Sequence, residues 1–254
     1  MPKLSRRRFL QIATLSLPAI AGIDVCLIEP RRLRVRHVAA GTEGRCRFVN
    51  FSDWHYRGDA DYAAEIVRTI NGLKPEFVCF TGDLIENKEY LAEALSFIRQ
   101  IQAPVYGSPG NHDYRSRAPF AEYEKTFRAT GGDWLVDRSI FLQQYDLEVH
   151  GMGWIGIHAF QAPRAGRRVL LSHYPAMADT LGQNFDLILS GHSHGGQIRL
   201  PFYGPLIIPT GVGAYDLGQF STRYGPMYVG AGVGTLSTIP LRWNCPPEVT
   251  VVTI

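Results

Sequence analysis

Short motifs along the chain contain side chains that are typical metal ligands. The motifs are S-D-W-H, T-G-D, G-N-H-D, L-L-S-H and G-H-S-H, and the donors they supply are Asp53, His55, Asp83, Asn111, His173, His192 and His194. Three of these donate oxygen and four donate imidazole nitrogen, a mixture that favours Mn²⁺, iron or Zn²⁺ over Mg²⁺ or copper. Seven donors exceed what one such ion binds, so the pattern predicts two divalent ions with Asp83 shared between them.

The spacing of the motifs indicates how a fold would bring these donors together. His55 and Asp83 are 28 residues apart, and so are Asp83 and Asn111. That length accommodates one helix and two short turns, the usual connection between neighbouring parallel strands. Asp-x-His and His-x-His place both side chains on the same face of an extended segment. Because the carboxyl ends of parallel strands meet at one edge of a sheet, we expect the donors to face a common cleft.

Apolar runs and helical patterns alternate through the first half of the chain. Strands are expected within 47–53, 77–83 and 103–113, and helices over 61–73, 87–101 (with Asn87 as N-cap) and 119–130. The second half is richer in strands, which are expected within 140–160, 167–173, 185–198 and 248–254. The alternation predicts a parallel sheet covered on both faces, within an α/β fold in which two sheets pack as a sandwich with flanking helices.

The charge of the chain is unevenly distributed. Residues 1–47 contain ten Lys and Arg residues against three Asp and Glu residues, whereas the remainder contains sixteen against twenty, a net charge of −4. The body of the protein is therefore mildly acidic, which argues against nucleic acid as a partner. At 254 residues and 45% apolar content, the chain can bury a full core in one domain.

Residues 1–21 resemble a twin-arginine export signal. Arg6 and Arg7 form the pair, Phe9 opens a short apolar stretch, and the small residues up to Ala21 fit a cleavage site. The resemblance implies export to the periplasm or cell envelope, with the twin-arginine machinery as a partner. The alternative is a basic amphipathic start that holds the protein at the face of the cytoplasmic membrane.

The rest of the chain divides into a linker and a domain. Residues 22–46 are expected to be a linker, and residues 47–254 the folded domain. The cysteines show no C-x-x-C spacing and are too few for a disulfide scaffold. Cys46 and Cys245 could pair in an oxidising compartment, or remain free thiols.

The ordered series D-x-H, G-D, G-N-H-D, H and G-H-S-H resembles the calcineurin-like metallophosphoesterases over residues 47–254. The resemblance implies a two-sheet α/β sandwich with a binuclear centre that hydrolyses phosphate esters by a metal-bound hydroxide. It assigns Asp53, His55, Asp83 and His194 to the first ion, and Asp83, Asn111, His173 and His192 to the second. His112 would then face the substrate and donate to a phosphoryl or leaving oxygen, and Asp113 would orient and charge that imidazole.

Two further segments, S-G-H-S-H-G-G-Q-I and P-L-R-W-N-C-P-P-E-V, resemble a small exported, membrane-associated bacterial branch of this family. Some of its members cleave the pyrophosphate of UDP-2,3-diacylglucosamine in lipid A biosynthesis. We therefore expect a phosphodiester or pyrophosphate hydrolase whose substrate is a phosphorylated small molecule or is lipid-linked. A nuclease-like phosphodiesterase and a non-catalytic metal-binding scaffold are the alternatives.

Candidates to bind a second phosphate are Arg115, Arg117 and Arg199. The segment 196–226 is either a lipid-facing rim or a packed loop.

Overall fold

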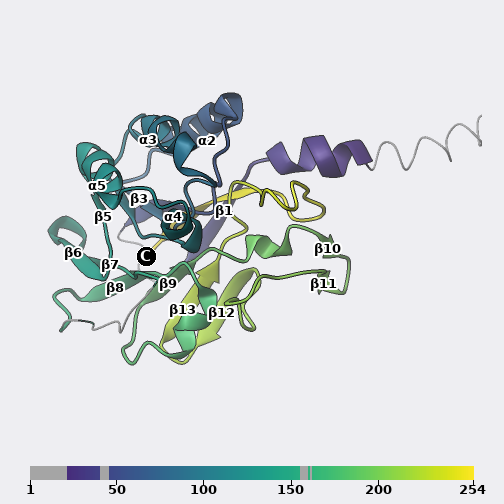
Figure 1. The fold of residues 1–254 in the computed structure, drawn as a ribbon. Helices are drawn as coiled ribbons and strands as arrows, with labels where there is room; N and C mark the ends of the chain where they lie inside the picture. Colours follow the sequence, from purple (N-terminus) through teal and green to yellow (C-terminus); the bar gives the residue numbers. More distant parts are fainter. Residues whose placement is uncertain (1–21, 41–45, 155–159, 161) are drawn as a thin grey trace, which may run out of the picture.

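The computed structural model describes residues 22–40, 46–154, 160 and 162–254 (Figure 1). The twin-arginine-like segment 1–21 lies outside these residues. No helix within them is long and apolar enough to cross a membrane.

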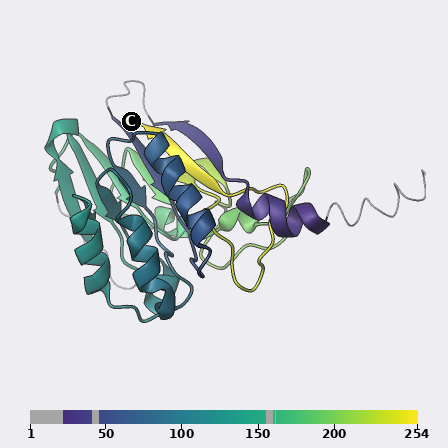
Figure 2. The same cartoon turned by 90° about the horizontal axis from the view of Figure 1, so that it is seen from above.

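The first sheet has the strand order β1-β14-β2-β3-β4-β5. Its strands are β1 (Arg34–Ala39), β14 (Glu248–Thr253), β2 (Arg47–Phe51), β3 (Val78–Phe80), β4 (Val105–Gly107) and β5 (Asp133–Trp134). Strands β2 to β5 are parallel, as predicted from the alternating pattern, and β14 joins β2 antiparallel. The helices α2 (Ala60–Gly72), α3 (Leu91–Ile98) and α5 (Phe120–Ala129) lie on one side of this sheet, and the short α4 (Asn111–Arg115) follows β4 (Figures 1 and 2).

The second sheet has the strand order β12-β13-β9-β8-β7-β6. Its strands are β12 (Gly218–Thr222), β13 (Gly225–Val229), β9 (Leu187–Ser190), β8 (Arg167–Leu171), β7 (Leu147–Gly151) and β6 (Arg138–Leu142). Strands β7, β8, β9 and β13 are parallel to one another. After β9 the chain forms a small separate hairpin of two antiparallel strands, β10 (Arg199–Leu200) and β11 (Gly204–Pro205).

Successive side chains along each strand point to opposite faces of the sheet, which divides the core into layers. In β2, Phe48 packs between the two sheets, whereas the next residue, Val49, packs beneath the helices. Leu147, Val169 and Leu187 of the second sheet complete the intersheet layer. This period of two is the expected consequence of successive strand side chains pointing to opposite faces. The two-sheet sandwich predicted from the sequence is confirmed, since one face of the first sheet packs on helices and the other on the second sheet.

Helix α2 shows how the local sequence sets these elements. Asp59 caps its start by accepting a hydrogen bond from the backbone N–H of Tyr62 at 3.2 Å. Ile66 and Ile70, one turn apart, are fully buried, and such burial stabilises each by about 1.5–3 kcal/mol. The helix predicted over 87–101 is shorter, because a tight turn, Lys88–Tyr90, precedes α3. Asn87 occupies the N-cap position of this turn in an extended conformation, but its side chain makes no capping hydrogen bond.

The predicted linker contains a strand. Residues Arg34–Ala39 form β1, which pairs in parallel with β14 at the edge of the first sheet. Only Val38 of this strand is buried, so its sequence lacks the apolar alternation that identifies strands. Backbone pairing with β14 orders it instead. The free thiols Cys46 and Cys245 are both buried but do not form the proposed disulfide, because Cys46 packs between the sheets and Cys245 lies against His194.

Candidate metal centre

The seven predicted donors meet at the carboxyl ends of strands from both sheets. The first sheet supplies Asp53 and His55 after β2, Asp83 after β3 and Asn111 after β4, and the second supplies His173 after β8 and His192 and His194 after β9. All of them are buried. Asp53 also links the two sheets directly, since its carboxylate accepts from the backbone N–H of His192 at 2.9 Å.

The donors form two adjoining groups. In the first, the ligand atoms of Asp53, His55 and His194 lie within 4.8 Å of one another. The second contains Asp83, His173 and His192 within the same limit, and Asn111 Oδ1 lies 3.1 Å from His173 Nε2. Asp83 Oδ2 is 3.2 Å from His173 Nε2 and 3.5 Å from His55 Nε2, so this carboxylate stands between the groups.

Three of the four donor imidazoles have their outer nitrogen fixed by a hydrogen-bond acceptor. His55 Nδ1 lies 2.8 Å from Glu86 Oε2, His173 Nδ1 lies 2.8 Å from Thr81 O, and His192 Nε2 lies 2.8 Å from Thr210 O. A proton on each outer nitrogen leaves the lone pair of the inner nitrogen directed to the centre. This is the arrangement that orients histidine toward a metal ion.

The inner nitrogens face one another at short range. His194 Nε2 is 3.1 Å from His55 Nε2, and His192 Nδ1 is 3.2 Å from His173 Nε2. Burial and the positive charge of His173 lower the pKa of His192 to about 3, and burial lowers the pKa of His194 well below its usual value. His173 differs, because burial lowers its pKa but the charge of Asp83 and the hydrogen bond to Asp83 raise that pKa to about 9. A divalent cation would take the place of that proton among the convergent nitrogens and carboxylates, so the donor set fits divalent metal ions.

The backbone around the donors is unusual. Asp53, His55, Asp83, His192 and His194 all have positive φ angles, between 45° and 67°. This left-handed conformation is unfavourable for residues with a side chain, and it is concentrated at functional sites. The neighbouring Gly110 is required for a different reason: a Cβ atom there would lie 2.2 Å from Asp83 Oδ1. The surrounding fold therefore holds the donor residues in backbone conformations that they would not adopt alone.

Asp113 does not play its predicted role. Its carboxylate accepts hydrogen bonds from the backbone N–H groups of Asp83, Leu84 and Gly110 at 2.8–3.0 Å, and from the hydroxyl of Tyr123 at 3.0 Å. Asp113 therefore fastens the loop that carries Asp83 to the start of α4. The prediction that it orients His112 is wrong, because successive helical side chains point about 100° apart.

Glu86, which the sequence reasoning missed, contacts His112 instead. Its Oε2 lies 3.3 Å from His112 Nδ1, and the same oxygen contacts His55. Burial lowers the pKa of His112, but the hydrogen bond to Glu86 and the charge of Asp83 raise it by more, so it lies above the ordinary value. The only sequence signal was an acidic residue three positions after Asp83, in a loop where solvated carboxylates are common.

A pocket of about 290 Å³ opens over the centre. His112, Arg115 and Tyr174 line it, together with Pro209–Thr210 and Leu236–Thr238. Of the three arginines proposed to bind a second phosphate, Arg115 lines this pocket. Arg117 and Arg199 do not line it, and Arg199 is held by Asp216 at 2.8 Å instead.

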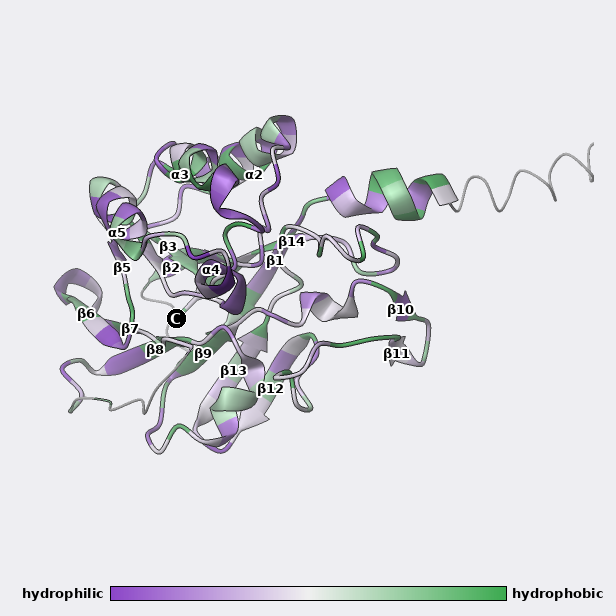
Figure 3. Cartoon of the chain, in the orientation of Figure 1, coloured by the Kyte–Doolittle hydropathy of each residue, from purple (hydrophilic) through white to green (hydrophobic). Residues whose placement is uncertain are grey.

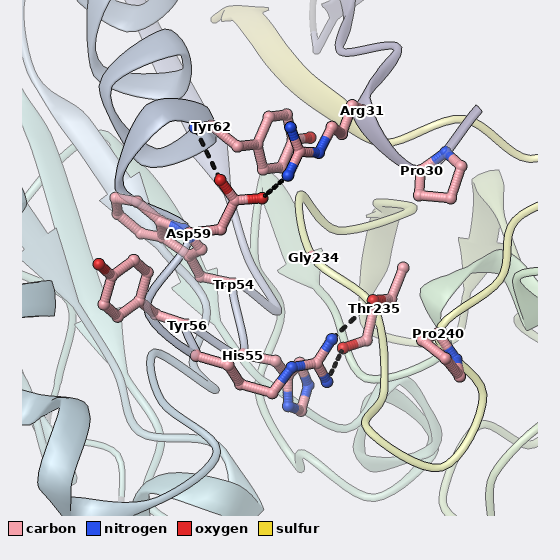
Figure 4. Close-up of a pocket in the computed structure, with 11 residues that line it drawn as sticks. Pro30, Arg31, Trp54, His55, Tyr56, Asp59, Tyr62, Gly234, Thr235 and Pro240 are labelled. Carbon is pink, nitrogen blue, oxygen red and sulfur yellow. Dashed lines mark hydrogen bonds and ion pairs between the residues drawn. The ribbon is translucent and has the colours of Figure 1, made fainter. Parts of the chain in front are cut away.

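A second pocket, of about 180 Å³, lies behind His55 between Trp54 and the loop of Gly234 and Thr235 (Figure 4). Arg57 donates there to Thr235 O at 2.9 Å and to Thr235 Oγ1 at 3.1 Å. The fully buried Arg242 donates to carbonyl oxygens of the same loop, at Ala231 and Gly234. These contacts fix the segment that leads into Leu236–Thr238. Neither arginine was identified from the sequence, because these contacts form only when the chain folds.

Several known proteins are similar to this chain. YkuE of Bacillus subtilis (strain 168), an uncharacterized metallophosphoesterase, is 31% identical, and the alignment covers 100% of this chain and 99% of YkuE. The phosphodiesterase YaeI of Escherichia coli (strain K12) is 28% identical, with 98% of each chain covered. The structure of an archaeal phosphodiesterase aligns with 82% of this chain and 99% of its own, at 11% identity and a TM-score of 0.45.

A family model gives the same assignment. The model described as calcineurin-like phosphoesterase matches residues 46–196, the part of the chain that supplies all seven donors. Together with the similarity to YkuE over the full length, this match shows that the chain belongs to the calcineurin-like phosphoesterase family and is a metal-dependent hydrolase of phosphate esters.

Proposed function

We propose that the protein is a binuclear hydrolase of phosphodiester or pyrophosphate bonds. The observation that carries this proposal is the position of Asp83, whose carboxylate stands between the group of Asp53, His55 and His194 and the group of His173 and His192. A carboxylate shared between two sets of donors would hold two metal ions side by side, as two-metal hydrolysis needs. Mn²⁺, iron and Zn²⁺ are the ions that the donor chemistry favours.

The side chains of the pocket have separable roles. When bound, divalent ions supply an activated water and neutralise charge on the phosphoryl oxygens. His112, partly exposed in the pocket and held by Glu86 at 3.3 Å, is placed to give a proton to the leaving oxygen. Arg115 lines the same pocket, and its guanidinium suits a second phosphate group.

A lipid-linked pyrophosphate, of which UDP-2,3-diacylglucosamine is the specific candidate, fits these features better than nucleic acid. A pyrophosphate has a second phosphate for Arg115, and the body of the protein carries a net charge of −4, which opposes binding of a polyanion. The name of YaeI, phosphodiesterase, supports a diester or pyrophosphate substrate over a monoester.

A substrate panel tests this proposal. Purified protein with Mn²⁺ should hydrolyse diesters and lipid-linked pyrophosphates faster than monoesters, and DNA poorly. Faster turnover of DNA than of any small diester would favour the nuclease-like alternative. Metal binding without turnover of any substrate would show a non-catalytic scaffold of the same fold.

We further propose that residues 1–21 direct export through the twin-arginine route, which carries folded proteins and so allows metal to load first. Changing Arg6→Lys together with Arg7→Lys should leave the protein in the cytoplasm, as measured by cell fractionation. Arg8→Lys, outside the pair, is the matched control and should be exported. Unchanged delivery of the double variant, or recovery of the unaltered protein at the cytoplasmic face of the membrane, contradicts this route.

A further inference from the structure

Exposed apolar side chains gather at one end of the protein. Among the described residues, nine of the twelve large hydrophobic side chains that are exposed come from three segments. They are Ile23, Leu27 and Ile28, then Phe202, Tyr203, Leu206, Ile207 and Ile208, and finally Trp243. We call these nine residues the apolar end surface. The helical turns Asp24–Ile28 and the β10–β11 hairpin project from the same end of the protein, away from β6 (Figures 1 and 2). The hydropathy colouring shows hydrophobic residues on the helical turns (Figure 3).

The hairpin tip is the most exposed part of this surface. Phe202 has a relative exposure of 111% and Tyr203 of 76%. Ile207, two residues after β11, is 65% exposed. Phe202 also has a φ of 65°, a conformation that is unfavourable for a bulky residue. Because the side chain of Phe202 is fully exposed, packing within the chain does not compensate for the exposed apolar area or for the unfavourable backbone conformation. Exposed apolar patches on soluble proteins mark sites of interaction with other molecules.

The charges beside the apolar end surface favour a lipid occupant. Residues 22–36 contain four arginines and two acidic residues, a net charge of +2. Arg31, Arg32 and Arg36 each pair with a carboxylate, of Asp59, Asp24 and Glu248 respectively, but their side chains remain 49–59% exposed. Apolar side chains flanked by arginine are the combination that binds at the surface of an anionic bilayer.

The apolar end surface adjoins the catalytic pocket along the chain. Pro209 and Thr210, which line the pocket, directly follow Ile208, and the carbonyl of Thr210 contacts His192. Leu236–Thr238, also in the pocket wall, precede Trp243 by five residues. We propose that the apolar end surface docks on an anionic lipid bilayer and brings the pocket to phosphate groups at the membrane. The docking stands independently, whereas the lipid-linked identity of the substrate rests on the proposed function.

Vesicle binding by the full chain tests this inference. Vesicles of phosphatidylcholine with phosphatidylglycerol should bind the protein more strongly than phosphatidylcholine alone, and added salt should weaken the difference. Phe202→Asn with Ile207→Thr should weaken binding by at least roughly tenfold for each side chain, since each loses most of its apolar burial. Asparagine tolerates the left-handed backbone at position 202, so the hairpin keeps its shape. Phe141→Ser is the matched control, because Phe141 is exposed on β6 at the opposite end.

Each outcome decides the inference. Weaker binding by the double variant but not by Phe141→Ser supports docking by the hairpin. Equal binding by all three proteins overturns it, and would assign lipid binding to residues 1–21. A change from dimer to monomer in the double variant, with vesicle binding unaltered, also overturns it, because the surface would then join two copies of the chain. Turnover of a soluble nitrophenyl phosphodiester should be the same in every variant. Its absence from the unaltered protein would contradict the proposed function without affecting the vesicle result.

Discussion

Replacing Asp83 with asparagine is expected to remove bound metal and to lower the hydrolysis of any phosphodiester by more than about 100-fold. Even a residue that only supports a metal ligand typically contributes 10–100-fold to activity or affinity, and Asp83 lies within 3.5 Å of both His55 and His173. Asparagine keeps the shape of the side chain but removes its charge, so the loss reports on metal binding rather than on packing. Elemental analysis and initial rates measure the two effects together.

Chelation of the unaltered protein should reproduce this loss, and Mn²⁺ should restore the rate. We expect the metal content of the loaded protein to approach two ions per chain. Asp61→Asn is the matched control, because Asp61 is exposed on α2 and should change neither metal content nor rate. A metal-stripped protein that keeps its rate, or an Asp83→Asn variant that keeps both ions, contradicts the proposed centre.

Replacing His112 with alanine is expected to lower turnover by about 10²–10⁴-fold, the usual effect of removing a general acid, while the metal content stays unchanged. His112 contacts Glu86 and lies within 4.8 Å of ligand atoms of His55 and Asp83, but it is outside the two donor sets proposed for the ions. The loss should be smaller for substrates with an acidic leaving group such as nitrophenolate, because that oxygen needs no proton. A loss independent of leaving-group pKa would assign His112 to phosphoryl charge stabilisation instead. His37→Ala, at an exposed position on β1, is the control.

The variant Glu86→Gln refines this test. Because Glu86 raises the pKa of His112, its removal should lower that pKa. If His112 acts in its protonated form, the alkaline limb of the pH–rate profile then moves to lower pH. A change in rate with no movement of this limb would limit Glu86 to the orientation of His55.

The sequence by itself determined most of the fold and the identity of the donors. Apolar runs with helical segments between them predicted the parallel strands β2, β3 and β4, because side-chain alternation and helical periodicity are local properties of the chain. Polar residues placed just after those strands were therefore expected at one edge of the sheet. The structure brings Asp53, His55, Asp83 and Asn111 together there, and the second sheet supplies the other three histidines.

Only the tertiary structure decided which side chains meet. Asp113 and Glu86 are both acidic neighbours of the metal motifs in sequence, yet the turn of α4 directs Asp113 toward backbone amides and leaves Glu86 beside His112. Strand β1 was missed because it is ordered by pairing with β14, more than 200 residues away, and not by its own pattern. Arg199 was misassigned because its ion pair with Asp216 forms only when the chain folds. Local periodicity specifies the elements, but the direction of each side chain and the partner of each edge are fixed only when the elements pack.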